Sequence, residues 1–228
     1  MKQRFFLLVL IVAFSAKMNF AQSGQFTTIA DNDPEASAIL KKVKEKYQSY
    51  KEIMAAFSLI ISIPEEDVLV QKGTLIRQGD MYYLKMPQQE VLCDGNSIAM
   101  VLHNNKEVQI SDIPEEDADD NLLTPQSIFD FYDSGKYTYL LVNDISEKGR
   151  VLHQIEFKPI ESDGEYFKIR LTIDKKTNAI VRAKAFASDG SRYTFVLGKT
   201  TTNTTHDKDF FTFKSDKFPG YYVEDLRE

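Results

Sequence analysis

The chain has 228 residues, a formal net charge of −6, three His, one Cys and no Trp. A single cysteine excludes an intramolecular disulfide framework and any multi-cysteine metal site, and the acidic balance argues against nucleic acid as a partner. With 43% hydrophobic and 27% charged residues, the composition is typical of a globular protein with a buried core.

The first 21 residues have the layout of a secretory signal peptide. Lys2 and Arg4 form a basic start, and an almost unbroken apolar run follows from Phe5 to Ala16. A membrane span needs about 20 apolar residues, so a cleaved signal is favoured over an anchor. We expect cleavage near Ala21 and export of a single domain over residues 22–228.

A helix is predicted next, followed by short strands. Asp33 and Pro34 are typical of a helix start, and apolar residues then recur at spacings of three and four up to Tyr50. From Ala55 the apolar period changes to two, which indicates strands joined by short turns in an antiparallel meander. The expected strands cover residues 55–63, 68–77, 81–86, 90–93, 98–103 and 107–110.

The middle of the chain interrupts the strands. Residues 115–120 form an acidic loop whose spacing misses the calcium-loop pattern, so we expect a solvated loop. Thr124 and Pro125 predict the start of a short helix, and strands resume over 137–142, 151–157, 167–173, 180–186 and 193–197. The predicted fold class is mostly β with α: a strongly curved sheet or part-closed barrel with helices on one face.

No motif for catalysis or metal binding is present. The three histidines, His103, His153 and His206, lie about fifty residues apart, and no nucleophile motif accompanies them. Cys93 has no basic neighbour in sequence that would activate its thiol, so we expect a buried structural cysteine. The sequence therefore predicts a protein that is not an enzyme, without catalytic residues, metal or cofactor.

Several strands are apolar on both faces. In the segment 81–86, Met81 and Tyr83 oppose Tyr82, Leu84 and Met86. One face of a curved sheet can cover a helix, and the other then packs on something else or lines a cavity. A plain core and a pocket for an adaptable apolar ligand both remain open from this pattern.

Short motifs in a characteristic order make the chain similar to the LolA family of periplasmic lipoprotein carriers. The motifs are Ala56-Phe57-Ser58, Gly73-Thr74-Leu75-Ile76-Arg77, Asp94-Gly95-Asn96-Ser97-Ile98, Thr124-Pro125, Leu171-Thr172-Ile173-Asp174, Phe211-Thr212-Phe213 and Pro219-Gly220-Tyr221-Tyr222-Val223. The chain departs from the family pattern in having no Trp. It also has Gln78-Gly79-Asp80 where the family often has an Arg-Pro pair, so Arg77 is the nearest candidate for the residue that latches the lid.

The resemblance implies an incomplete, half-open β-barrel covered by a lid of short α-helices, which shelters lipoprotein acyl chains in the periplasm. Its partners would be lipoproteins and an inner-membrane lipoprotein-releasing ABC transporter; whether an outer-membrane receptor also exists stays open. The carrier would act as a monomer. The implied cavity residues are Phe57, Leu59, Ile61, Leu75, Tyr82, Leu84 and Met86 from the sheet and Ile128, Phe129 and Tyr132 from the lid. Two alternatives remain, a lipoprotein-sensing regulatory module on the same fold and an envelope hydrolase.

Overall fold

The structure, a computed structural model, describes residues 32–113, 127–161 and 164–227. The predicted signal peptide, the acidic loop 115–120 and the predicted helix start at Thr124 lie outside the described residues. No helix in the described ranges has the length and apolar character needed to cross a membrane.

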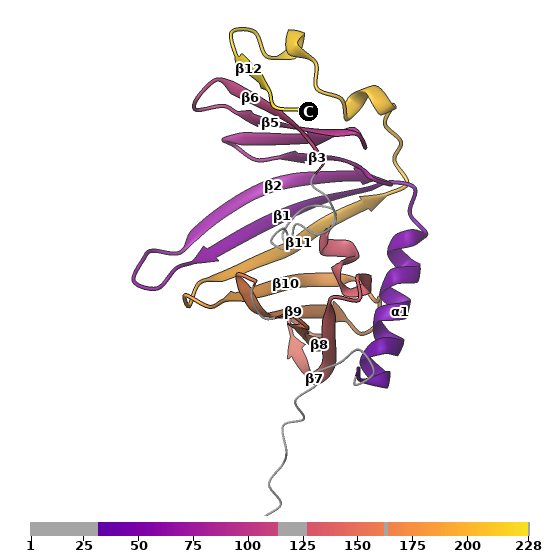
Figure 1. Cartoon of the computed structure of the whole chain (residues 1–228). Helices are drawn as coiled ribbons and strands as arrows, with labels where there is room; N and C mark the ends of the chain where they lie inside the picture. Colours follow the sequence, from indigo (N-terminus) through magenta and orange to yellow (C-terminus); the bar gives the residue numbers. More distant parts are fainter. Residues whose placement is uncertain (1–31, 114–126, 162–163, 228) are drawn as a thin grey trace, which may run out of the picture.

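One curved, open sheet dominates the fold (Figure 1), and it confirms the predicted fold class. Its 12 strands follow the order β12-β6-β5-β4-β3-β2-β1-β11-β10-β9-β8-β7 in the described part of the chain, and every neighbouring pair is antiparallel except β12–β6. The strands are β1 (Ile53–Ser62), β2 (Leu69–Gln78), β3 (Met81–Lys85), β4 (Gln89–Cys93), β5 (Ser97–Leu102), β6 (Glu107–Asp112), β7 (Tyr137–Glu147), β8 (Arg150–Pro159), β9 (Tyr166–Asp174), β10 (Ile180–Ala187), β11 (Arg192–Thr202) and β12 (Tyr222–Asp225).

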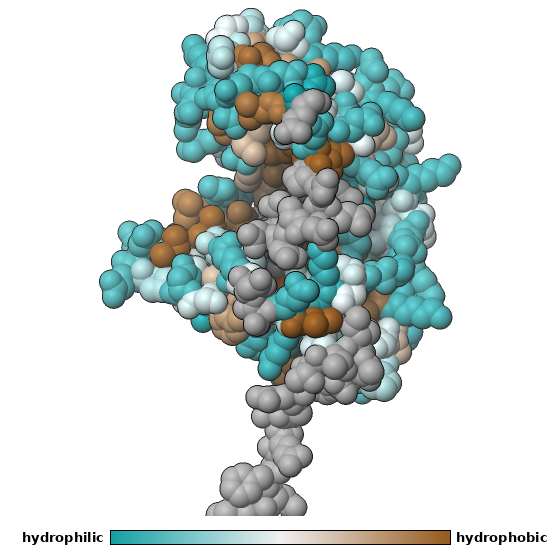
Figure 2. Space-filling view, in the orientation of Figure 1, coloured by the Kyte–Doolittle hydropathy of each residue, from teal (hydrophilic) through white to brown (hydrophobic). Residues whose placement is uncertain are grey.

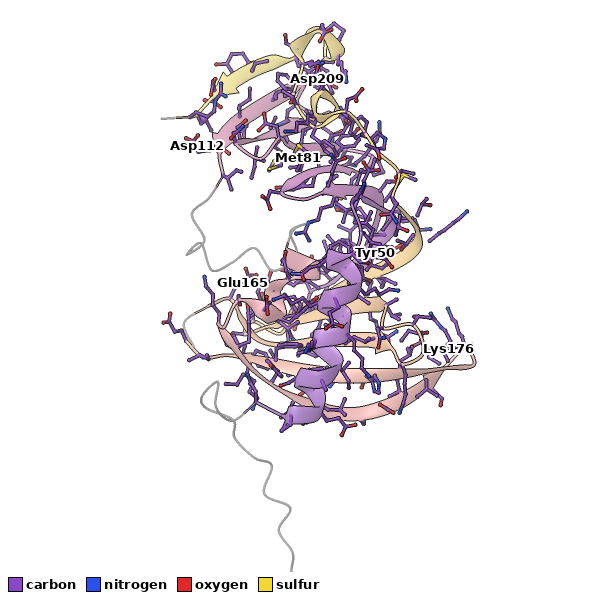
Figure 3. The ribbon with its side chains drawn as sticks, turned by 90° about the vertical axis from the view of Figure 1, so that its right-hand side faces the viewer. Tyr50, Met81, Asp112, Glu165, Lys176 and Asp209 are labelled. Carbon is purple, nitrogen blue, oxygen red and sulfur yellow. The ribbon has the colours of Figure 1, made fainter. Side chains whose placement is uncertain are left out.

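The helix α1 (Pro34–Gln48) begins where the sequence predicts it. The Asp33 carboxylate accepts a hydrogen bond from the Glu35 amide at 2.8 Å, which caps the first turn. The apolar side of α1, with Ile39, Leu40 and Val43, is buried in the main core. Figure 3 shows that α1 ends near Tyr50 and lies across the β7–β10 half of the sheet, whereas the part around Met81 projects beyond it.

The register of the strands gathers apolar side chains on the concave face. Leu59 pairs with Phe195 of β11, and Phe195 pairs with Ala183 of β10. Because residues opposite one another in a ladder share a face, these positions form one surface. The Phe57 ring stacks on Phe195 at 4.7 Å between ring centroids.

Gly73 of β2 leaves room for that stack. A Cβ atom at Gly73 would lie 2.5 Å from Cζ of Phe57 and 2.4 Å from the Lys85 carbonyl oxygen. The motif that begins with Gly73 thus has a packing reason, since only a residue without a side chain lets the Phe57 ring lie across β2.

The C-terminal segment covers the convex face of β3–β6. Phe213, Phe218 and Tyr221 pack there against a second core, and the segment contains the short 3₁₀-helices η4 (Lys208–Phe210) and η5 (Ser215–Lys217) before β12 joins β6 in parallel. The second core consists of Leu92, Ala99, Val101 and Val108. This parallel strand was not predicted from the sequence.

The outer strand β7 is partly covered by the residues that precede α1. The Tyr139 amide donates to Asn32 Oδ1 at 2.8 Å, and the Leu141 amide donates to Asp33 Oδ2 at 3.0 Å. The Asp33 amide in turn donates to the Tyr139 carbonyl oxygen at 3.2 Å. Asp33 therefore serves the helix start and the strand edge with the same carboxylate.

Candidate functional site

A set of half-exposed apolar side chains continues the main core along the concave face beyond the reach of α1. We call it the open apolar face; it consists of Leu59, Leu84, Met86, Ile98 and Met100, which pack against the main core, and Ile61, which follows Leu59 on the same face of β1. Figure 2 shows hydrophobic residues on the β1–β2 hairpin and in the hollow between this hairpin and the β3–β6 part of the molecule. The open apolar face thus lines a concave part of the molecular surface.

Strand pairing explains how these residues come together. Val91 of β4 pairs with Leu84 on one side and with Met100 on the other, and Cys93 pairs with Ile98. Side chains of paired positions lie on the same side of a sheet. Leu69, which is 50% exposed, pairs with Ile61 and extends the apolar surface toward the tip of the hairpin.

The structure divides the ten predicted cavity residues into two groups. Leu59, Ile61, Leu84 and Met86 are half-exposed and lie on the open apolar face. The other six are buried in the core: Phe57, Leu75, Tyr82, Ile128, Phe129 and Tyr132. These six side chains belong to the main core, and a role for them in holding a ligand stays a prediction.

The segment that follows the undescribed middle of the chain forms two 3₁₀ turns, η2 (Ser127–Phe129) and η3 (Phe131–Asp133), instead of the predicted short α-helix. The backbone of Asp130 between them has φ −144°, outside the helical range, which interrupts the turns. Residues 127–133, here called the lid segment, pack on the concave face through Phe131, whose ring lies 5.0 Å from that of Phe157.

Arg77, the predicted latch, contacts the lid segment. Its Nη2 donates to Asp130 Oδ2 at 2.8 Å, and its guanidinium lies 5.9 Å from the centre of the Phe129 ring. Burial raises the pKa of Asp130, and the positive charge of Arg77 opposes this shift. A second ion pair joins Lys44 of α1 to Asp133, so the lid segment is tied to both the sheet and the helix.

A small cavity of about 250 Å³ lies between the end of α1, the β2–β3 turn and the lid segment. Its lining combines the charged residues Arg77, Asp80, Asp130 and Asp133 with aromatic rings that include Tyr47 and Phe129. The hydroxyl of Tyr132, which also lines it, is buried without a hydrogen-bond partner among the described residues. The charged groups in this lining suit water or a polar group better than an acyl chain, which distinguishes the cavity from the open apolar face.

The helix α1 is held against the sheet by a buried tyrosine. The Ile180 amide of β10 donates to the Tyr47 hydroxyl at 3.0 Å, and the Tyr47 ring lies 4.8 Å from that of Phe129. Burial raises the pKa of Tyr47 to about 12, so the phenol remains neutral over the physiological range.

The residues with chemical reactivity are scattered. His103 contacts Glu90 at 3.3 Å, His153 contacts Asp144 at 2.6 Å and His206 contacts Glu52 at 2.9 Å, in separate parts of the fold. Cys93 is buried, as predicted, and its burial raises the pKa of the thiol. Within the described ranges, no group of three or more His, Cys, Asp or Glu is placed to hold a metal ion.

Sequence reasoning missed some residues of the site. Ile98 and Met100 continue the open apolar face on β5, and strand parity would have indicated them once Cys93 was aligned with Ile98. Asp130, the partner of Arg77, lies 53 residues away in the sequence, and no local pattern signals such a contact.

No protein-family model and no curated protein sequence matches this chain, whereas several solved structures do. An uncharacterized conserved protein from Thermus thermophilus has a TM-score of 0.55 at 8% identity, covering 85% of this chain and 99% of its own. A DUF1329 family protein from Desulfovibrio piger has a TM-score of 0.48 at 12% identity, covering 82% of this chain and 99% of its own. A LolA superfamily protein from Nitrosomonas europaea has a TM-score of 0.43 at 11% identity, covering 78% of this chain and 97% of its own. At such identities the likeness concerns the fold alone, and the curved open sheet is the fold that this chain shares with the Thermus protein.

Proposed function

We propose that this protein is a periplasmic carrier that holds the acyl chains of lipoproteins on the open apolar face and moves them from the inner to the outer membrane. The observation that carries the proposal is the continuity of the open apolar face with the main core, at a place that α1 leaves uncovered. The LolA-like motifs around Gly73 and Asp94 agree with this function.

The chemistry of the open apolar face suits a lipid chain. An acyl chain gains about 0.8 kcal/mol for each methylene removed from water, so a lipoprotein needs apolar shelter to cross an aqueous compartment. Met86 and Met100 lie on this surface, and the flexible methionine side chain adapts to chains of variable shape. Loading and release then need no covalent step, so we propose that the protein is not an enzyme.

The proposed carrier acts as a monomer after cleavage of its signal peptide. An inner-membrane lipoprotein-releasing ABC transporter loads it, and an outer-membrane receptor is an optional acceptor. The lid segment, tied to the sheet through Arg77 and Asp130, covers the buried part of the concave face, next to the open apolar face, until cargo arrives. Breaking that tie on loading is the role that we assign to Arg77 as a latch.

Two substitutions in one strand test the proposal. Leu59→Asn places an amide on the open apolar face, whereas Ile60→Asn places it on the opposite face of β1, where Ile60 is also half-exposed. We expect Leu59→Asn to weaken the binding of a fluorescent diacylated peptide about tenfold or more. Ile60→Asn should leave binding within about twofold, and thermal unfolding checks that both variants fold.

Equal binding by both variants would refute the proposed site. Depletion of the protein in cells separates carrier from sensor, because loss of a carrier leaves lipoproteins at the inner membrane. A changed stress response with normal lipoprotein sorting would instead favour a regulatory module. Hydrolysis of the acylated peptide during the binding assay would favour an enzyme.

A further inference from the structure

A cluster of cations surrounds one phenylalanine on the convex face of β9–β11. The Phe186 ring centre lies 4.5 Å from Lys168 Nζ, 5.0 Å from Arg192 Cζ, 5.2 Å from Lys184 Nζ and 5.7 Å from Arg170 Cζ. We call these five residues the basic patch. Its density of positive charge stands out in a chain whose net charge is −6.

The strand register builds the basic patch. Lys184 pairs with Arg170 on β9, and Phe186 pairs with Lys168 on β9 and with Arg192 on β11. The buried residues Ala183 and Ala185 alternate with them and belong to the main core, so the basic patch faces away from the open apolar face.

A β-bulge places a second aromatic ring beside the basic patch. The pairing of β9 and β10 shifts between Phe186 and Ala187, and such a shift reverses the side to which the following residues point. Phe167 accordingly lies 6.3 Å from Phe186 between ring centroids, and it is 49% exposed. The patch therefore combines cations with an exposed apolar group.

Few carboxylates neutralise these cations. Glu156 forms ion pairs with both Lys168 and Arg170. No carboxylate of the described residues forms an ion pair with Lys184 or Arg192. Burial lowers the pKa of Lys184, and the neighbouring positive charges of Arg192 and Arg170 lower it further. Like charges held this close repel one another unless an anionic partner lies over them.

We propose that the basic patch docks the protein on an anionic phospholipid surface. Clustered Lys and Arg side chains attract acidic headgroups, and an exposed aromatic ring inserts at the boundary between headgroups and acyl chains. Because the patch and the open apolar face lie on opposite sides of the sheet, docking would leave the open apolar face accessible. This inference goes beyond the carrier function and does not depend on it.

A lipid surface fits the patch better than an acidic peptide does. A peptide that adds to a sheet needs an unpaired strand edge, and β9 and β10 each have neighbours on both sides. The cations instead spread over a pleated surface that spans three strands, at spacings of about 5 Å from strand to strand. Mobile lipid phosphates can adjust to such an array.

Vesicle binding by the mature protein tests the inference. We expect co-sedimentation with vesicles that contain phosphatidylglycerol, weakened by salt, and little with phosphatidylcholine alone. Each cation near such a surface strengthens binding roughly fivefold, so Lys168→Gln with Lys184→Gln should weaken it about 25-fold. Arg170 still pairs with Glu156 in this double variant, which keeps that carboxylate compensated.

The matched control removes the same charge elsewhere. Lys41→Gln with Lys42→Gln changes two exposed lysines of α1, and it should leave vesicle binding within about threefold. An equal loss in both double variants, or equal binding to neutral vesicles, would overturn the proposal. The protein could instead bind polyglutamate more tightly than it binds vesicles, and lose that binding in the Lys168→Gln, Lys184→Gln variant. This result would reject a membrane as the partner in favour of an acidic protein. Leu59→Asn should bind vesicles normally, which separates docking from the proposed cargo site.

Discussion

Glu52 anchors the C-terminal segment to the start of β1, and its replacement by glutamine should loosen that segment. The Glu52 side chain is 1% exposed. Its carboxylate accepts hydrogen bonds from the His206 amide at 3.0 Å and from His206 Nδ1 at 2.9 Å, and a third bond comes from the Thr204 hydroxyl. Glu52→Gln keeps the size of the side chain but removes its charge and one acceptor oxygen.

The expected cost follows from these contacts. A hydrogen bond to a charged group contributes about 1.5–3 kcal/mol to the free energy of unfolding, and glutamine turns an NH₂ group toward donors that then lack an acceptor. We expect Glu52→Gln to lower the free energy of unfolding by about 2–4 kcal/mol at neutral pH.

The pH dependence provides a second measurement. Burial raises the pKa of Glu52, but the bonds from Thr204 and His206 outweigh it, so this pKa lies below its ordinary value of 4.5. A carboxyl whose pKa is lowered by folding adds stability above its unfolded pKa, and this stability is lost as the pH falls through the folded pKa. The difference between wild type and Glu52→Gln should therefore shrink once the pH drops below about 4.5.

Urea unfolding at a series of pH values measures this difference, and hydrogen exchange of the amide of His206 locates it in the C-terminal segment. A difference below about 0.5 kcal/mol at neutral pH would refute the anchoring role. A difference that stays constant down to acid pH would show that the charge of Glu52 is not what stabilises the segment.

Other substitutions test the packing around the site. Gly73→Ala should lower the free energy of unfolding by about 1–3 kcal/mol, because the new methyl group meets Phe57 and the Lys85 carbonyl oxygen. Gly164→Ala is the control, since a Cβ there meets no atom of the described residues within 4 Å, and equal melting temperatures of the two variants would contradict the close approach. Tyr132→Phe removes a hydroxyl that has no hydrogen-bond partner among the described residues, so stability should stay equal or rise by about 1 kcal/mol. A clear loss in calorimetry would reveal a partner. A double-mutant cycle on Arg77→Gln and Asp130→Asn should give a coupling of about 0.5–1.5 kcal/mol; zero coupling would remove Arg77 as a latch.

Local sequence signals predicted the helix and the meander well. Asp33 and Pro34 fixed the start of α1 because capping and proline geometry depend on adjacent residues only. The alternation of Phe57, Leu59 and Ile61 placed them on the concave side of β1, where the structure has them. Such patterns depend on the strand itself and need no knowledge of its partners.

Features that depend on distant contacts were not predictable. The pairing of β12 with β6 involves a strand of four residues. Such a strand is too short for its alternation of apolar and polar residues to be recognised in the sequence. The burial of each side chain was not predictable from the alternation either. Phe57 and Leu59 belong to the same pattern, yet Phe57 is buried against Phe195 whereas Leu59 is half-exposed. Burial of a position depends on whether α1 or the lid segment packs over it, and the pattern of a single strand does not contain that information.

An open sheet differs from a closed barrel in having two outer strands, and unpaired strand edges invite aggregation. Asn32 and Asp33 occupy backbone groups of β7 that would otherwise be available to a second molecule. Because the same Asp33 carboxylate caps α1, loss of this single side chain would fray the helix and expose the edge together. A protein with an open sheet is thereby protected from polymerising through this edge.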